Sequence, residues 1–272
     1  MDARFQRRIQ RYGWDKAADS YEAGWRDSLA DVQQRLIETA AARPGEHVLD
    51  LACGTGLVTF PLASAVGPGG RVVANDISQA MIDIIQRETE QRGLVQIEAL
   101  RSDAESLEAF PDNMFDLVTC ALGFMYFPEP DRAMREIRRV LKPGGRVVIA
   151  VWGARKNCGW ADIFPIVDAR VESSVCPMFF QLGTGRALAQ QMEMAGLTSI
   201  TDARMMVDLP YASEDAACDA AFIGGPVALA YSRFDDVTRR NARKEYAASI
   251  DAYRFGEAYR IPGEFVVARG YR

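Results

Sequence analysis

A strand-to-helix transition built around two glycines sets the strongest limit on the fold. HVLDLA (47–52) has the length and apolarity of a short buried strand, and CGTG (53–56) follows it as a turn. LVTFPLASAV (57–66) continues as an apolar helix. Glycines at such a turn let the backbone approach a ligand at the N-terminus of the helix. The segment therefore predicts a ligand site in an α/β protein.

The alternation of strand and helix continues along the chain. Pro-Gly-Gly sequences at 68–70 and 143–145 end two of the helical patterns. Apolar strands that alternate with helices predict parallel βαβ units with helices on both faces of the sheet. The further expected strands are 71–77, 95–103, 115–122 and 146–152, with helices at 78–93 and 130–142. The last third should add a helix at 183–197, a strand at 201–211, a largely helical stretch at 213–254 and a final strand at 263–271.

We expect the chain to divide into four parts. The first is an N-terminal helical cap, because Trp14, Tyr21 and Trp25 recur at helical spacing on one face. The predicted parts are this cap (1–45), an α/β core that binds the ligand (46–211), a helical lid insertion (212–257) and the final strand of the core sheet (258–272).

Composition narrows the classes of function. The formal net charge of −5 argues against a nucleic-acid partner, and we interpret the one dense basic stretch, RFQRRIQR (4–11), as a solvated helix face. No run of 18 apolar residues is present, so we expect no membrane span, and the polar N-terminus does not resemble a secretory signal. The five cysteines form no CxxC pair, which favours reduced thiols in a cytoplasmic protein without a metal site.

Acidic residues around the glycine turn distinguish two classes of ligand. Asp50 precedes Gly54 by four residues, where a carboxylate would repel the pyrophosphate of a dinucleotide and attract the α-ammonium group of S-adenosylmethionine (SAM). Dinucleotide-binding turns also carry a third glycine, where this chain has Thr59. Asp76 ends the second strand and is placed to accept hydrogen bonds from the ribose of either cofactor. Asp103 is either an acceptor for an adenine amino group or a turn residue, and the sequence leaves both open.

Several motifs in this order resemble those of the class I SAM-dependent methyltransferases, and within them the group of the ubiquinone and menaquinone C-methyltransferases. They are VLDLACGTG, the acid in VVANDIS, the SDAE after the third strand, and FDLVTCALGFMYFPEP followed by EIRRVLKPGGRVVI. WDKAADSYEAGW resembles the opening helix of the group, and FQLGTGRALAQQMEMAGL resembles the helix before its sixth strand. The resemblance covers roughly residues 12–210. It implies a Rossmann-like α/β fold with a seven-stranded, mostly parallel sheet whose last strand is antiparallel.

The resemblance also implies a cofactor site. SAM would lie across the carboxyl ends of the first, second and fourth strands, with Asp76 on the ribose. Tyr21 would reach it from the N-terminal helix, although a core aromatic is an equally good interpretation of that residue. The residues implied to bind SAM are Tyr21, Asp50, Ala52, Gly54, Thr55, Gly56, Asp76, Ile77, Met81, Asp103, Ala104 and Ala121.

The acceptor is left open. The quinone enzymes carry an Arg-Asn pair after the fourth strand, where this chain has Met125-Tyr126, and the stretch 212–257 is longer than its counterpart, so the quinone substrate is not carried over. Aromatic residues around the expected pocket favour a small, aromatic or moderately apolar acceptor. The predicted acceptor residues are Trp14, Trp25, Phe124, Tyr126 and Trp152, with Trp160, Phe179 and Phe222 as further candidates.

No catalytic residue is assigned. The single histidine, His47, starts the first strand, at the end away from the glycine turn, so we expect a structural role for it. Methyl transfer would then depend mainly on proximity. A SAM-binding protein with other chemistry stays possible, since its cofactor motifs would be the same, and an NAD-dependent oxidoreductase is less favoured. The sequence does not distinguish a monomer from a homodimer.

Overall fold

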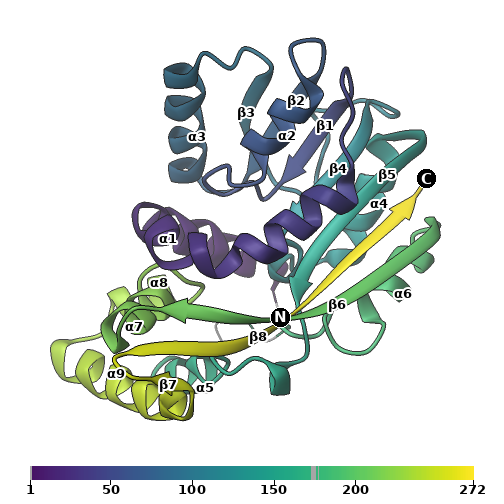
Figure 1. Cartoon of the computed structure of the whole chain (residues 1–272). Helices are drawn as coiled ribbons and strands as arrows, with labels where there is room; N and C mark the ends of the chain where they lie inside the picture. The colour runs from purple at the N-terminus through teal and green to yellow at the C-terminus, as the bar shows by residue number, and fades with distance from the viewer. Residues whose placement is uncertain (1, 173–175, 177) are drawn as a thin grey trace.

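A mostly parallel sheet with helices on both faces forms the centre of the protein, which confirms the predicted α/β class (Figure 1). The structure is a computed structural model that describes residues 2–172, 176 and 178–272. Its strands are β1 (His47–Leu51), β2 (Arg71–Asp76), β3 (Ile97–Arg101), β4 (Phe115–Ala121), β5 (Leu141–Trp152), β6 (Thr198–Tyr211), β7 (Arg254–Phe255) and β8 (Ala258–Tyr271). Its helices are α1 (Ala3–Ala40), α2 (Thr59–Val66), α3 (Gln79–Arg92), α4 (Pro130–Val140), α5 (Ile163–Asp168), α6 (Ala187–Met194), α7 (Glu214–Phe222), α8 (Ala228–Ser232) and α9 (Asp236–Ile250).

The strand order is β3-β2-β1-β4-β5-β8-β6. The strands β1 to β5 pair in parallel, and β8 runs antiparallel between β5 and β6. These seven strands are the expected ones. The two-residue strand β7 is an addition that the sequence did not indicate, and it forms a hairpin with β8 through Gly256, whose φ is +66°.

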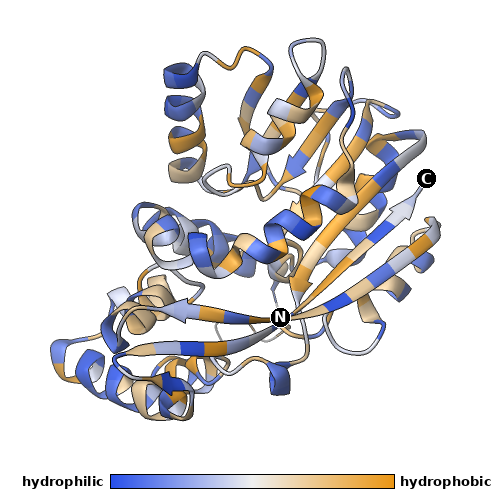
Figure 2. Ribbon diagram, in the orientation of Figure 1, coloured by the Kyte–Doolittle hydropathy of each residue, from blue (hydrophilic) through white to orange (hydrophobic). Residues whose placement is uncertain are grey.

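The strands at the centre of the sheet are made of buried residues. The strands β1, β2, β4 and β5 are buried along almost their whole length, as expected for strands covered on both faces. Figure 2 shows them coloured mainly as hydrophobic, whereas the outer surfaces of helices such as α9 are largely hydrophilic. The carboxyl ends of β1, β2 and β4 lie side by side, because Leu51 pairs with both Asn75 and Cys120.

The N-terminal segment is one helix, α1, which crosses the sheet (Figure 1). Its second half packs into the core through Trp25, Leu29, Val32 and Leu36, which follow each other at three- and four-residue steps. Its first half continues beyond this core contact toward the carboxyl ends of the strands, which places it above the expected ligand site.

The helices α7, α8 and α9 follow β6 and precede β8. These two strands are 14 residues long, longer than the others, and Figure 1 shows them running out of the sheet toward this helical group. The group packs back on α1, where Trp25 Nε1 donates to the carbonyl oxygen of Ala220 at 3.0 Å. Among the described residues, none of the helices combines the length and apolarity needed to cross a bilayer.

Candidate functional site

The glycine turn after β1 is held open by unusual backbone conformations. Ala52 has φ +51° and Gly54 φ +55°, both in the left-handed region. Cys53 N donates to the carbonyl oxygen of Asn75 at 3.0 Å, which fixes the turn against the end of β2. A Cβ atom at Gly54 would meet only the ring of Tyr21, at 4.0 Å. The ring of Tyr21 of α1 therefore lies next to the turn.

Asp76 closes β2 beside this turn. Its carboxylate is buried and accepts from Gly54 N at 3.0 Å and from Ser78 N at 2.9 Å. Burial raises the pKa of Asp76 to about 6, and the two backbone donors offset part of that rise. A carboxylate has about four acceptor positions, so Asp76 keeps capacity for hydroxyl donors from a ligand.

Asp50 lies one layer beneath the turn. Thr59 Oγ1 and Thr119 Oγ1 each donate to one of its oxygens at 2.7 Å, and the side chain is buried. Burial raises the pKa of Asp50 to about 6 despite these two hydroxyls. Asp50 does not line the cavity described next, so the predicted contact with an ammonium group stays a prediction.

A cavity opens at the carboxyl ends of β1, β2 and β4, with about 710 Å³ of space free of atoms, counted to its open mouth. Nine of the twelve residues predicted to bind SAM line this cofactor cavity: Tyr21, Ala52, Gly54, Asp76, Ile77, Met81, Asp103, Ala104 and Ala121. Besides Asp50, the exceptions are Thr55 and Gly56, which face a separate groove on the other side of the turn.

One face of α1 forms the roof of the cofactor cavity. Arg7, Gln10, Trp14 and Tyr21 follow each other at three-, four- and seven-residue steps, and all four line the cavity. Sequence reasoning found Trp14 and Tyr21 but missed Arg7 and Gln10, although the helical spacing that connects them is visible in the chain. The other lining residues that it missed are Asn75, Glu105, Leu122, Gly123, Phe127 and Pro128.

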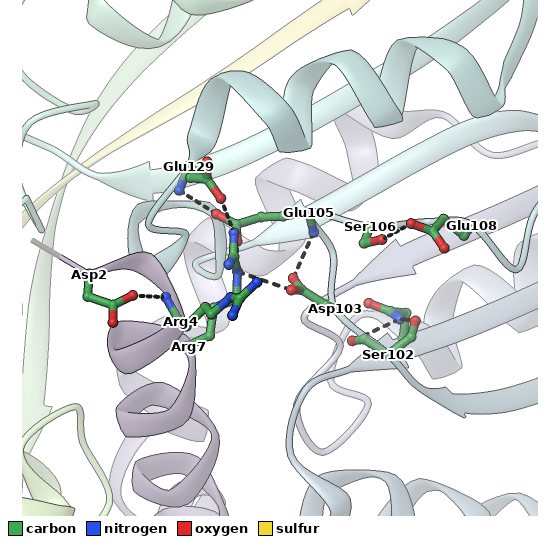
Figure 3. A network of polar contacts seen from close by, with 10 residues as sticks. Asp2, Arg4, Arg7, Ser102, Asp103, Glu105, Ser106, Glu108 and Glu129 are labelled. Atoms are coloured by element: carbon green, nitrogen blue, oxygen red, sulfur yellow. Dashed lines mark hydrogen bonds and ion pairs between the residues drawn. The ribbon is translucent and has the colours of Figure 1, made fainter.

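Arg7 shows that the basic stretch 4–11 is not simply a solvated face. Figure 3 shows its guanidinium reaching from α1 to Asp103, Glu105 and Glu129. Arg7 Nε lies 3.1 Å from an oxygen of Asp103, and the side chain of Glu105 is only 1% exposed. Asp103 also accepts from Glu105 N at 2.9 Å, so it serves as a turn residue and lines the cavity as well. These ion pairs hold the N-terminal end of α1 against one end of the cavity.

A smaller space with aromatic walls adjoins the cofactor cavity, and we call it the aromatic chamber. It shares Trp14, Tyr21, Leu122 and Tyr126 with the larger cavity. Its complete wall consists of Trp14, Tyr21, Trp25, Leu29, Leu122, Tyr126, Trp152, Trp160, Gly225 and Pro226. Four of the five predicted acceptor residues therefore face one or both spaces.

Phe124 is the exception among the predicted acceptor residues. It is fully buried, packs against Phe127 with ring centroids 5.1 Å apart, and lines neither space. Of the further candidates, Phe179 packs behind Trp160 and Tyr126, and Phe222 packs against Tyr246. Phe124 and Phe179 therefore lie behind the walls, next to Phe127 and to Tyr126 and Trp160 respectively, whereas Phe222 packs within the helical group that follows β6.

His47 lies at the start of β1, the end opposite the glycine turn, as expected. It is exposed, and its backbone N–H donates to Asp116 Oδ2 at 2.9 Å. The buried phenols of Tyr21 and Tyr126 have raised pKa values because burial disfavours the phenolate. Both therefore stay protonated at neutral pH.

Two curated relatives of the chain are methyltransferases by name. The chain is 40% identical over 126 residues to the ubiquinone/menaquinone biosynthesis C-methyltransferase UbiE of Shewanella frigidimarina, which covers 46% of this chain and 50% of that protein. It is 36% identical over 134 residues to the nocamycin O-methyltransferase of Saccharothrix syringae, over 49% of this chain and 48% of that protein. The chain thus spans about half the length of the curated relatives it matches.

Solved structures share the fold at low sequence identity. A putative methyltransferase from Bacillus halodurans superimposes with a TM-score of 0.61 and 22% identity, over 89% of this chain and 98% of that one. The [4+2]-cyclase SpnF superimposes with a TM-score of 0.59 and 21% identity, over 92% of this chain and 83% of that one. The model of the ubiE/COQ5 methyltransferase family matches residues 25–160, half of the chain, so this protein belongs to that family.

Proposed function

We propose that the protein is a SAM-dependent methyltransferase that acts on a small, aromatic or moderately apolar molecule. The observation that carries this proposal is the charge of the cofactor cavity. Asp76, Asp103 and Glu105 line it against one guanidinium, that of Arg7. Such a wall suits a cofactor with a net positive charge, as SAM has, and disfavours the anionic pyrophosphate of a dinucleotide.

The residues present fit SAM in other respects. Asn75 lines the cavity, and its buried Oδ1 has no hydrogen-bond partner among the described residues, so this oxygen would be an acceptor for a ligand hydroxyl or amino group. Asp76 would hold the ribose, and Ile77 and Met81 would pack against the adenine. The left-handed backbone at Ala52 and Gly54 leaves the turn open for close approach of the methionine part.

Held by these residues, SAM would supply an activated methyl group on its sulfonium sulfur. The protein's part is to align the acceptor and exclude bulk water. The wall common to the cofactor cavity and the aromatic chamber would fix the distance between the two ligands. It consists of Trp14, Tyr21, Leu122 and Tyr126. Protonated Tyr21 and Tyr126 do not accept a proton at neutral pH, which agrees with catalysis mainly by proximity.

Isothermal titration calorimetry with SAM, S-adenosylhomocysteine and NAD tests the cofactor assignment. We expect saturable one-to-one binding of the first two ligands and no heat with NAD. Formation of S-adenosylhomocysteine with a panel of aromatic acceptors then tests transfer. Binding of NAD in place of SAM would refute the assignment, and SAM binding without turnover on any acceptor would favour the non-methyltransferase alternative, which family membership does not support.

A further inference from the structure

We propose that the outward side of the start of α1 docks on the surface of an anionic bilayer, with phospholipid headgroups as its partner. The residues of this surface, which we call the basic-aromatic face, are Arg4, Phe5, Arg8, Arg11 and Tyr12. At 3.6 residues per turn their side chains fall within an arc of about 120°. The residues of α1 that line the cofactor cavity lie outside this arc, so the inference does not depend on the cofactor assignment.

The basic-aromatic face is open to solvent. Phe5 is 41% exposed and Tyr12 is 49% exposed, and the side chains of Arg4 and Arg8 are exposed as well. The inward side of the same turns is buried through Gln6, Gln10 and Gly13. Exposed aromatic rings between cations are typical of helices that lie in the interface of a bilayer.

The cations of this face are not neutralised by acidic side chains. Of the arginines at the start of α1, Arg7 alone forms ion pairs within the part of the chain that the structure describes, and it points to the other side of the helix (Figure 3). Arg8 lies over the ring of Phe5 at 5.6 Å, and Arg11 lies over the ring of Tyr12 at 5.5 Å. These contacts hold each guanidinium beside a ring and leave its charge available to an external anion.

Helix stability does not explain the basic residues. Arg4 lies in the first turn of α1, where the positive end of the helix dipole disfavours a cation, and that turn contains no acidic residue. The side chain of Asp2 is the N-cap and accepts from Arg4 N at 2.9 Å. Asp15, the next acid along the helix, accepts from Ser78 Oγ at 2.7 Å, which turns it toward α3. An external anionic partner accounts for cations at this end of the helix.

The acidic character of the whole chain does not oppose docking at this face. The formal net charge is −5, but charges more than about 8 Å from the bilayer are largely screened at physiological ionic strength. The exposed rings favour a bilayer over a nucleic acid, because Phe5 and Tyr12 would leave water on entering the headgroup region. The arginines would meanwhile remain at the level of the phosphates.

Co-sedimentation of the full chain with lipid vesicles tests the proposal. One set of vesicles is pure phosphatidylcholine, and the other contains equal parts of phosphatidylcholine and phosphatidylserine. We expect binding to the anionic vesicles to be up to about 100-fold stronger, at about fivefold for each of the three arginines. High salt should remove most of this preference.

Two pairs of matched variants locate the contact. The double variant Arg4→Gln, Arg8→Gln should bind anionic vesicles about 25-fold more weakly. The double variant Arg240→Gln, Lys244→Gln removes the same charge from exposed positions of α9 and should bind as the wild type does. Glutamine is as good a helix former as arginine, so an unchanged urea midpoint is expected for both.

The second pair tests the aromatic part of the face. Phe5→Ser should weaken binding about three- to tenfold, because the exposed part of the ring no longer leaves water on docking. Phe255→Ser is the control and should have no effect. Phe255 is 65% exposed and lies beneath Arg260 at 4.7 Å, so it has the same kind of cation–ring contact on the distant hairpin of β7 and β8.

Hydrogen–deuterium exchange of the wild-type protein keeps the proposal falsifiable if a variant does not fold. Anionic vesicles should slow exchange in residues 3–12 more than in α9. Equal binding to the two kinds of vesicle, equal losses in the variants of α1 and α9, or unchanged exchange in residues 3–12 would each overturn the proposal. Tighter binding to duplex DNA than to anionic vesicles at the same salt would overturn it in favour of a nucleic-acid partner. None of these outcomes bears on the binding of SAM.

Discussion

The affinity for SAM is expected to depend on pH through Asp76. Burial raises the pKa of this carboxyl to about 6 from its ordinary value of 3.8, so much of it is protonated at pH 5 in the free protein. Ribose hydroxyl donors and a cationic ligand stabilise the ionised form, so binding lowers this pKa and releases a proton. By linkage, affinity falls as the pH drops below about 6 and is constant above it. If the pKa returned to its ordinary value in the complex, the change of about 2 units would correspond to a loss of up to about 100-fold at low pH.

Calorimetry at pH 5, 6 and 7, in two buffers of different ionisation enthalpy, measures both the affinity and the number of protons released. Asp76→Asn should bind SAM more weakly and remove most of the pH dependence. Asp50→Asn is the matched control, because burial raises its pKa to about 6 as well but its side chain does not line the cavity. A wild-type affinity that is constant from pH 5 to 7 would refute the reasoning.

The raised pKa of Asp76 affects folding stability in the opposite direction to cofactor affinity: as the pH rises, stability falls whereas affinity increases. The native carboxyl of Asp76 binds its proton more tightly than the unfolded chain does, so its contribution to the free energy of unfolding is largest below about pH 4. That contribution is lost, by about 3 kcal/mol, as the pH rises from about 4 to 6 in the absence of ligand. SAM should therefore stabilise the protein more at pH 7 than at pH 5.

Three further predictions concern single residues. Arg7→Met should lower the free energy of unfolding in urea by about 1–3 kcal/mol, between the values for exposed and buried ion pairs, because only one of the three carboxylate partners of Arg7 is buried. An unchanged urea midpoint would contradict a stabilising role for these ion pairs. Gly56→Ala should cost about 1–2 kcal/mol more than Gly45→Ala in the same assay, because both residues have positive φ but only at Gly56 would a Cβ atom come within 2.5 Å of the Phe60 ring; equal losses would argue against the clash. His47→Ala should keep both SAM affinity and turnover, and loss of turnover at unchanged affinity would show that the exposed histidine acts in the reaction.

Sequence reasoning located most of the cofactor cavity because its residues follow the strand ends directly. Ala52, Gly54 and Asp76 lie within a few residues of β1 and β2, and parallel strands bring their carboxyl ends to one edge. The regular alternation of strands and helices also fixed the fold class, since apolar runs of that length can be buried only inside a covered sheet. The family resemblance rests on the same stretch of chain.

Packing of distant segments decided the rest. Asp50 accepts hydrogen bonds from Thr59 and from Thr119 of a different strand, contacts that spacing along the chain does not specify, and its predicted contact with an ammonium group stays a prediction. Phe124 is aromatic and follows β4, but it faces the core and not the chamber.

From the chain alone, local spacing determined that there is a glycine turn with an acid at the end of the next strand, because both features are set within single strand–turn units. Only the tertiary structure decided that Arg7 fastens α1 over the cavity and that the four tryptophans meet in one chamber. These contacts include pairs of residues that lie about a hundred or more positions apart in the chain. Which residues meet depends on how the helices and loops pack on the sheet, and periodicity along the chain does not specify that packing.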